Sequence, residues 1–259
     1  SYSTHGTHVA SIAGGSGAGT EYRGIAPGVN FLFVTFLVDE GAVLDAWEWM
    51  YQKSLEEGKR LVVNMSWGLY HAGTLDGNSV LSNAISAYTD LGVVFVNSGG
   101  NNGNVDFHLK HEFTNDTIKT RVNFYSYSAH EYMWGQSIHS WGEVGNSFSN
   151  KIQIKNSSGT VLAESPFYST ASVSAYIDTF IVANQDTVWY NISADAAHPM
   201  NSRPQMRFRV KCTNQSLRVM LNSTAPDGLI HYWNVTELSN DVGNWGMPFT
   251  TFQTGSISG

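Results

Sequence analysis

The pattern of apolar residues changes near Asn104, and this change constrains the fold more than any other feature of the sequence. Before it, short apolar runs alternate with segments of helical period, as in a parallel sheet covered by helices. After it, short runs of mostly alternating polarity follow one another between turn-rich stretches. Such runs are typical of an antiparallel β-sandwich. The sequence therefore predicts two architectures in one chain.

The first hundred residues predict strands and helices in the order β, α, β, α, β. The strands are expected at 30–36, 61–66 and 93–97, and the helices at 42–57 and 78–91. The last two strands are nearly continuous apolar runs, as buried parallel strands require. A glycine follows each predicted helix, where a helix commonly ends.

The second half predicts a sandwich of jelly-roll or Ig-like type, inserted into the first architecture. We expect residues 1–104 to form the first part of an α/β domain, 105–241 the inserted β-sandwich, and 242–259 a return to the α/β domain. The faces of the sandwich strands should alternate between polar and apolar side chains. Its clearest strands are expected at 122–125, 152–154, 188–190, 206–210 and 217–220.

Composition excludes some classes of function. The formal net charge is −7 with only 14 Lys and Arg residues, which argues against a nucleic-acid partner. The single cysteine, Cys212, rules out an intrachain disulfide. No apolar run in this piece approaches the length of a membrane span. Many glycines and aromatics with few charges favour a secreted, periplasmic or cell-surface protein, and the oligomeric state is not indicated.

One block of ten residues carries the first recognisable motif. His5-Gly6-Thr7-His8-Val9-Ala10-Ser11-Ile12-Ala13-Gly14 resembles the histidine motif of the subtilase family, the subtilisin-like serine proteases. The resemblance implies that His5 is catalytic and opens a helix beneath the active site. The glycine after the histidine leaves room for substrate and nucleophile. A metal pair formed by His5 and His8 is disfavoured, because no Glu lies between them and no third ligand has a recognisable spacing.

A second block, Val62-Val63-Asn64-Met65-Ser66-Trp67-Gly68, ends a predicted buried strand. In the family this segment pairs with the backbone of the substrate, so the resemblance implies a substrate-binding role for Ser66, Trp67 and Gly68. Binding an extended peptide requires free backbone groups, and glycine leaves space for a substrate side chain. On its own the block would read as a core strand followed by an incidental turn.

The third block is Val93-Val94-Phe95-Val96-Asn97-Ser98-Gly99-Gly100-Asn101-Asn102-Gly103, a strand and a glycine-rich loop. It resembles the family's oxyanion loop, which implies that Asn101 donates to the oxyanion and converges with His5 on a common point. Ser98, Gly99 and Gly100 would border the primary specificity pocket. Ser98-Gly99 stands where the family usually has Ala-Ala, and Asn102 where it has an acid. The turn Gly24-Ile25-Ala26-Pro27-Gly28 also resembles the family.

Two members of the catalytic triad cannot be assigned. The family's aspartate lies upstream of the histidine, and no Gly-Thr pair here continues as the family's Gly-Thr-Ser-Met-Ala segment. We therefore expect an internal fragment with an incomplete three-layer parallel sheet, inactive by itself. The resemblance implies that the parent is a serine endopeptidase, which hydrolyses the peptide bonds of protein or peptide substrates through an acyl-enzyme.

A second hypothesis is a non-catalytic protein- or carbohydrate-binding module on a pseudoprotease scaffold. Eight aromatic residues could form a binding platform or the sandwich core: Tyr125, Tyr127, Tyr132, Trp134, Trp141, Trp189, Tyr190 and Trp233. No cofactor and no metal ligand set is assigned. Calcium in the parent is compatible with the family but is not assignable to residues of this sequence.

Overall fold

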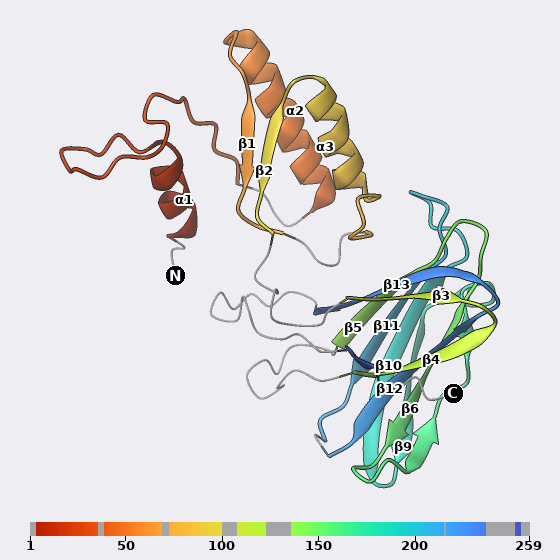
Figure 1. Ribbon diagram of the computed structural model, residues 1–259. Helices are drawn as coiled ribbons and strands as arrows, with labels where there is room; N and C mark the ends of the chain where they lie inside the picture. The colour runs from red at the N-terminus through yellow and green to blue at the C-terminus, as the bar shows by residue number, and fades with distance from the viewer. Residues whose placement is uncertain are drawn as a thin grey trace. The chain divides into compact units, whose positions relative to one another are not determined.

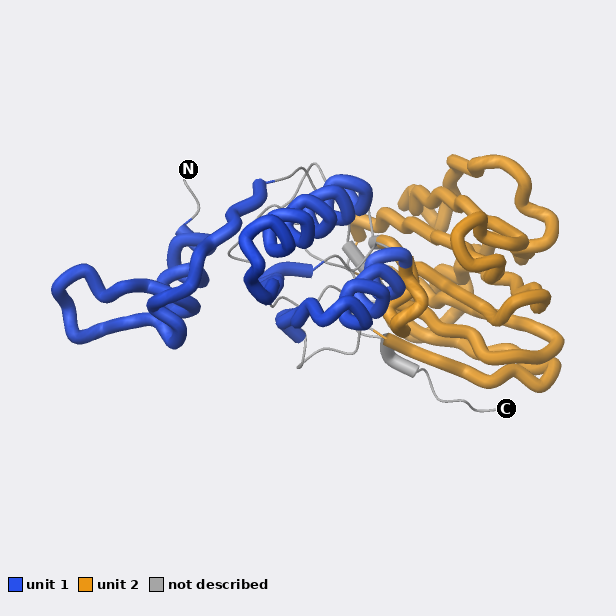
Figure 2. The backbone as a smooth tube through the Cα atoms, turned by 90° about the horizontal axis from the view of Figure 1, so that it is seen from above, with its two compact units in different colours: residues 1–68, 80–99 blue, residues 69–79, 100–259 orange. Residues whose placement is uncertain are grey.

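The computed structural model divides the chain into two compact units (Figure 2). Unit 1 comprises Ser1–Gly68 and Val80–Gly99, and unit 2 comprises Leu69–Ser79 and Gly100–Gly259. The structure describes residues 4–35, 39–68, 73–99, 108–122, 136–214, 216–236 and 252–254. Neither unit is continuous in sequence, because one short loop within the first hundred residues belongs to unit 2.

The first helix, α1 (His5–Gly14), is closed by the glycine-rich turn that follows it. The backbone amides of Gly24, Ile25 and Ala26 donate to carbonyl oxygens at the carboxyl end of α1 or just beyond it, at 2.9–3.0 Å. Gly14 is buried where this turn returns. A Cβ atom there would lie 2.6 Å from Val29 Cγ2 and 2.7 Å from Phe31 Cζ, so only glycine fits without rearrangement. Of the small residues of the motif, Gly14 thus serves close packing of α1, whereas Gly6 and Ala13 are exposed.

The strand predicted at 30–36 is wrong over the residues that the structure describes there. Residues 30–35 are irregular, and the rings of Phe31 and Phe33 stack on each other with centroids 5.2 Å apart. A strand requires a hydrogen-bonded neighbour, and in the described part of unit 1 the only strand pair is β1 with β2. An alternating apolar pattern therefore does not form a strand when no neighbouring strand pairs with it.

The other predicted elements of the first half are confirmed. They are α2 (Glu40–Glu56), β1 (Val62–Met65), α3 (Val80–Asp90) and β2 (Val94–Asn97), labelled in Figure 1. The strands pair in parallel, from Val62 opposite Val94 to Met65 opposite Asn97. No helix in the described ranges is long and apolar enough to cross a membrane, including α2 with its 17 residues.

The core of unit 1 lies between this strand pair and the two helices. Val43 and Trp47 of α2 pack with Val63 of β1 and with Val93, and the indole meets the Phe95 ring edge-on at 5.2 Å. A hydrogen bond of 2.7 Å from the Tyr88 hydroxyl to Glu48 joins α3 to α2. The opposite face of the strand pair, with Val62, Val94 and Val96, is exposed.

Unit 2 consists of two antiparallel sheets. One sheet has the order β3-β13-β5-β11-β10-β9, and the other has the order β14-β4-β12-β6-β7, with β8 also pairing with β6. The strands are β3 (His108–Phe113), β4 (Asp116–Val122), β5 (Gln136–Trp141), β6 (Ser149–Lys155), β7 (Val161–Glu164), β8 (Tyr168–Ser169), β9 (Ile177–Ala183), β10 (Asp186–Asp195), β11 (Gln205–Lys211), β12 (Arg218–Ala225), β13 (Gly228–Thr236) and β14 (Phe252–Thr254).

Inward-facing residues of both sheets form one hydrophobic core. Ile138, Ile192 and Phe208 come from the first sheet, and Ile152 and Leu221 come from the second, all fully buried or nearly so. The predicted β-rich second half is therefore confirmed. The strands predicted at 152–154, 188–190 and 206–210 lie inside observed strands. The strand at 217–220 begins one residue later, and of 122–125 only Val122 lies within the described residues.

We expect Ile192→Ala to lower the free energy of unfolding of unit 2 by about 2–5 kcal/mol, because it removes buried methyl groups and leaves a cavity. Val182→Ala, on the exposed face of β9, is the matched control and should change stability little. Hydrogen exchange resolved by segment is the measurement. Equal losses for the two variants would contradict a shared core.

Candidate functional site

Two of the predicted substrate-binding segments lie side by side. Ser66–Gly68 follows β1, and Ser98 and Gly99 follow β2. The amide of Ser98 donates to the carbonyl oxygen of Met65 at 3.1 Å, and its hydroxyl donates to the carbonyl oxygen of Trp67 at 3.4 Å. These bonds extend the strand pairing past the carboxyl ends of the parallel strands, which is where α/β sheets bind ligands.

Two glycines of this edge are exposed. Trp67 is half-buried against the core of unit 1, whereas Gly68 and Gly99 are exposed. A Cβ atom added to either glycine would meet nothing within 4 Å. Ser66 Oγ accepts a hydrogen bond of 3.0 Å from the side-chain amide of Asn64. The two exposed glycines therefore leave space for a substrate side chain beside these strand ends.

The other predicted site residues are His5, Gly100 and Asn101. His5 is the first residue of α1 and is exposed. Gly100 and Asn101 lie outside the described residues, so the convergence of His5 with Asn101 remains a prediction. His8 is also exposed on α1, and the described residues contain no group of three or more metal-ligating side chains.

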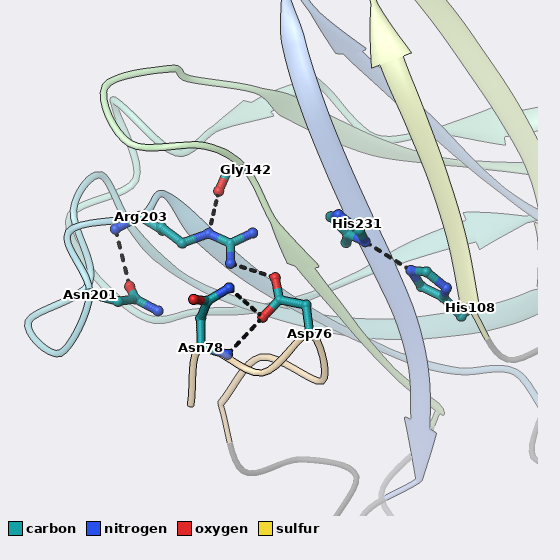
Figure 3. Close-up of polar contacts among 7 residues, drawn as sticks. All are labelled: Asp76, Asn78, His108, Gly142, Asn201, Arg203 and His231. Atoms are coloured by element: carbon teal, nitrogen blue, oxygen red, sulfur yellow. Dashed lines mark hydrogen bonds and ion pairs between the residues drawn. The ribbon is translucent and has the colours of Figure 1, made fainter. Parts of the chain in front are cut away.

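A second polar cluster, which the sequence did not reveal, lies in unit 2 (Figure 3). Arg203 Nη1 contacts Asp76 Oδ2 at 2.6 Å, and Arg203 Nε donates to the carbonyl oxygen of Gly142 at 2.7 Å. Asp76 Oδ1 accepts hydrogen bonds from the backbone and the side chain of Asn78 at 3.2 and 3.1 Å. Only 12% of the Arg203 side chain and 18% of the Asp76 side chain are exposed.

The charge of Asp76 is strongly stabilised. Burial alone would raise the pKa of this carboxyl, but the hydrogen bond from Arg203, the neighbouring Thr74 hydroxyl, the guanidinium charge and the Asn78 side chain outweigh it and lower the pKa to about 2. Asp76 is therefore a carboxylate at every physiological pH. Because the unfolded carboxyl titrates near 3.8, this contribution to stability is lost progressively as the pH falls from about 3.8 through about 2.

An apolar contact stands beside the ion pair. Leu75 packs against Trp141 of β5 and Trp233 of β13, each only 3% exposed. Thr74 is also buried. The loop from Gly73 to Ser79 is thus docked onto unit 2 by neighbouring charged and apolar side chains.

Two histidines, His108 of β3 and His231 of β13, form a third feature of unit 2. His108 Nε2 and His231 Nδ1 are 2.9 Å apart, so one ring nitrogen donates to the other and at least one imidazole is neutral. Both rings lie nearly parallel to the indole of Trp233. Burial lowers the pKa of His108, and the charge of His231 lowers it further. Burial lowers the pKa of His231 more than the Asp76 carboxylate raises it.

The aromatic set divides between core and surface. Trp141, Tyr190 and Trp233 are buried, as expected for core residues, whereas Trp189 is 47% exposed. Trp189 of β10 lies 5.1 Å from the ring of Phe180 on β9, which is 51% exposed. The other aromatic residues of the set, Tyr125, Tyr127, Tyr132 and Trp134, lie outside the described residues.

Little in the sequence pointed to the Asp76 cluster. Asp76-Gly77-Asn78 reads as an ordinary turn, and Arg203 is 127 positions away. The only local signal for the histidine pair is that His231 and Trp233 share one face of a strand.

Two comparisons place the chain among known proteins. A model of the subtilase family matches residues 1–216. The solved structure of the CspB protease of Clostridium perfringens superposes with a TM-score of 0.60 at 17% sequence identity. The match covers 96% of this chain and 50% of that protein's chain, so this chain spans half the length of that relative. At this identity the likeness concerns the fold alone.

We expect the imidazoles of His108 and His231 to titrate below the ordinary value of 6.5. Because the folded state then binds fewer protons than the unfolded state, unit 2 should lose stability as the pH falls from about 6.5 towards the folded pKa values, and no further below them. Lys110, Arg203, Asp76 and Glu143 also act on the pair. NMR titration of the ring signals is the measurement.

His231→Asn is the companion variant. It removes the neighbouring charge and should move the pKa of His108 upwards, since that charge is one of its causes. A His108 pKa at or above 6.5 in the unmodified chain would contradict the proposed electrostatics.

Proposed function

Because this chain belongs to the subtilase family, we propose that it is part of a serine endopeptidase that hydrolyses protein or peptide substrates through an acyl-enzyme. The match of the family model over residues 1–216 carries the proposal. It is supported by the two strand ends at Ser66–Gly68 and Ser98–Gly99, which lie side by side and carry the exposed glycines Gly68 and Gly99.

In the proposed mechanism His5 acts as the general base. It accepts the proton of a serine hydroxyl as the oxygen attacks the scissile carbonyl, and then gives that proton to the leaving amine. Asn101 donates a hydrogen bond to the oxyanion of the tetrahedral intermediate. Water afterwards hydrolyses the acyl-enzyme. Ser66–Gly68 would pair with the substrate backbone, while Ser98, Gly99 and Gly100 border the specificity pocket.

The aspartate and serine of the triad are proposed to come from a longer parent chain. No segment of these 259 residues matches either motif, and the matched CspB protease is about twice as long as the stretch covered here. The isolated chain should therefore be inactive. Without the serine there is no nucleophile, and without the aspartate the imidazolium lacks its orienting partner.

The β-rich half is proposed to be a jelly-roll or Ig-like domain, spanning about 105–241 and inserted into the protease domain, with 242–259 returning to it. The common core of two antiparallel sheets supports this reading. We further propose a secreted, periplasmic or cell-surface location, based on composition alone. No cofactor is proposed.

One observation favours a second function of a different class. The exposed Phe180 and Trp189 pair forms a small aromatic platform on β9 and β10. Exposed aromatic faces of this kind can bind sugar rings, so unit 2 could act as a carbohydrate-binding module. If the parent lacks the triad serine, a non-catalytic protein- or carbohydrate-binding role on a pseudoprotease scaffold becomes the better proposal.

We expect the parent protein to hydrolyse an oligopeptide reporter and the 259-residue chain to show no activity. Asn101→Ala in the parent should lower kcat by about 10²–10³ with little change in KM, a magnitude that was established on subtilisin itself. His5→Ala should abolish measurable turnover. Asn83→Ala, on the exposed side of α3, is the control and should be neutral. Unchanged turnover in Asn101→Ala would refute the assignment.

The carbohydrate alternative has its own test. If the platform binds sugars, the chain should be retarded in gels that contain a soluble polysaccharide, and Trp189→Ala should weaken that affinity about tenfold or more. Tyr176→Ala, which removes another exposed aromatic of unit 2, is the control. Equal mobility of all three proteins in a panel of polysaccharides would rule this function out.

A further inference from the structure

Strand β11 of unit 2 carries three basic side chains on one face. Every second residue of this strand is fully buried in the core between the two sheets, namely Met206, Phe208 and Val210. Because side chains alternate along a strand, Arg207, Arg209 and Lys211 lie on the outer face of the sheet, away from the other sheet. The whole chain has only 14 Lys and Arg residues and a formal net charge of −7. Three cations along one strand face are therefore a local exception to the acidic character of the chain.

The aromatic platform of Phe180 and Trp189 lies beside the carboxyl end of this basic row. Trp189 of β10 is level with Lys211 of β11, and Phe180 of β9 is level with Trp189. Val188 and Tyr190 are buried in the core, so Trp189 faces outwards on the same side as Lys211. Neighbouring strands are about 4.8 Å apart, so these three outward side chains start within about 10 Å of one another.

The charge beside the platform is positive. Lys211 takes part in none of the ion pairs between residues that the structure describes. In the next row of the same face, Arg209 is level with Asn191, and Asn191 is level with Asp178 of β9. Asp178 therefore starts two strands away from Arg209, at about 10 Å. The basic end of β11 is thus free to attract an anion that lies on the platform.

An aromatic face and a neighbouring cation together match the chemistry of an acidic sugar. The apolar face of a sugar ring stacks on an indole, and in a uronic acid the carboxylate is attached directly to that ring. A ring that stacks on Trp189 therefore holds its carboxylate close to the ammonium of Lys211. Arg209 adds a planar guanidinium fork, which pairs with a carboxylate through two parallel hydrogen bonds. A neutral sugar would gain from the stacking alone.

We propose that the outer face of β9, β10 and β11 binds an acidic polysaccharide made of uronic acid units. Phe180 and Trp189 stack on the sugar, and Lys211 and Arg209 pair with its carboxylates. The proposal rests on the carbohydrate-binding alternative proposed above for unit 2, and it narrows the ligand class of that site.

Isothermal titration calorimetry on the 259-residue chain tests the ligand class with oligogalacturonate and its fully methyl-esterified form. Both ligands have the same rings, but esterification removes the carboxylate charges. We expect the ester to bind at least about tenfold more weakly. Added salt should weaken binding of the acid much more than binding of the ester, because salt screens exposed charges.

The outcomes separate the two proposals. Equal affinity for acid and ester would overturn the acidic ligand and leave carbohydrate binding intact. Absence of binding for both ligands would also overturn the acidic ligand, and the polysaccharide gels described above then decide separately whether unit 2 binds sugars at all.

Two variants test the residues. Lys211→Met should lower the affinity for oligogalacturonate about tenfold and leave the affinity for the ester unchanged, because it removes the charge and keeps an apolar stem. Trp189→Ala should weaken binding of both ligands, since both stack on the indole. Lys155→Met is the matched control, because Lys155 is also a half-buried lysine at the end of a strand, β6 of the other sheet.

Lys155→Met should change neither affinity. Equal losses in the two lysine variants would show a non-specific attraction of polyanions and overturn the proposal. Tighter binding of dextran sulfate, which has sulfate groups and no carboxylate, than of oligogalacturonate would overturn the assignment to uronic acids.

Discussion

The parallel pairing of β1 with β2 is the constraint on which the functional reading depends. Met65 and Asn97 are level partners, so the two chains leave the sheet side by side, and Ser98 continues the pairing through its bonds to Met65 and Trp67. Without this register, Ser66–Gly68 and Ser98–Gly99 would be unrelated loops. Helices α2 and α3 hold the register by burying Val63 and Val93 on one side of the pair. The chemistry proposed for this edge is thus a consequence of ordinary core packing.

Around Trp233, unit 2 carries two groups of ionisable side chains whose pKa values are shifted for different reasons. The carboxylate of Asp76, with a pKa of about 2, stays ionised throughout the physiological range. Burial lowers the pKa of both His108 and His231, and the hydrogen bond between their rings requires that at least one imidazole is neutral. The ion pair thus provides a constant anchor, while the stacked imidazoles beside it are the part of this face that responds to pH.

The sequence predicted the helices and strands that local patterns encode, and it did not predict the contacts between residues far apart in the chain. The helical period that includes Val43 and Trp47 and the apolar runs of β1 and β2 are local signals, and all three elements were predicted correctly. Residues 30–35 carry a similar apolar alternation but gain no pairing neighbour among the described strands. In β10, period two indicates that Trp189 and Tyr190 face opposite sides, yet only the packed sheets decide which is exposed. No local sequence pattern around Asp76 or Arg203 indicates that these two side chains form an ion pair.

Unit boundaries that do not follow the chain have a consequence for any attempt to dissect this protein. A cut near residue 100 separates Leu75 and Asp76 from the tryptophans and the arginine that hold them. The amino-terminal product would keep Asp76 without its ion-pair partner. The carboxyl-terminal product would expose the indoles of Trp141 and Trp233 and the guanidinium of Arg203 to water. The halves are therefore not modules to be exchanged at a junction. The boundary between the two units falls within the first hundred residues, at the loop that belongs to unit 2.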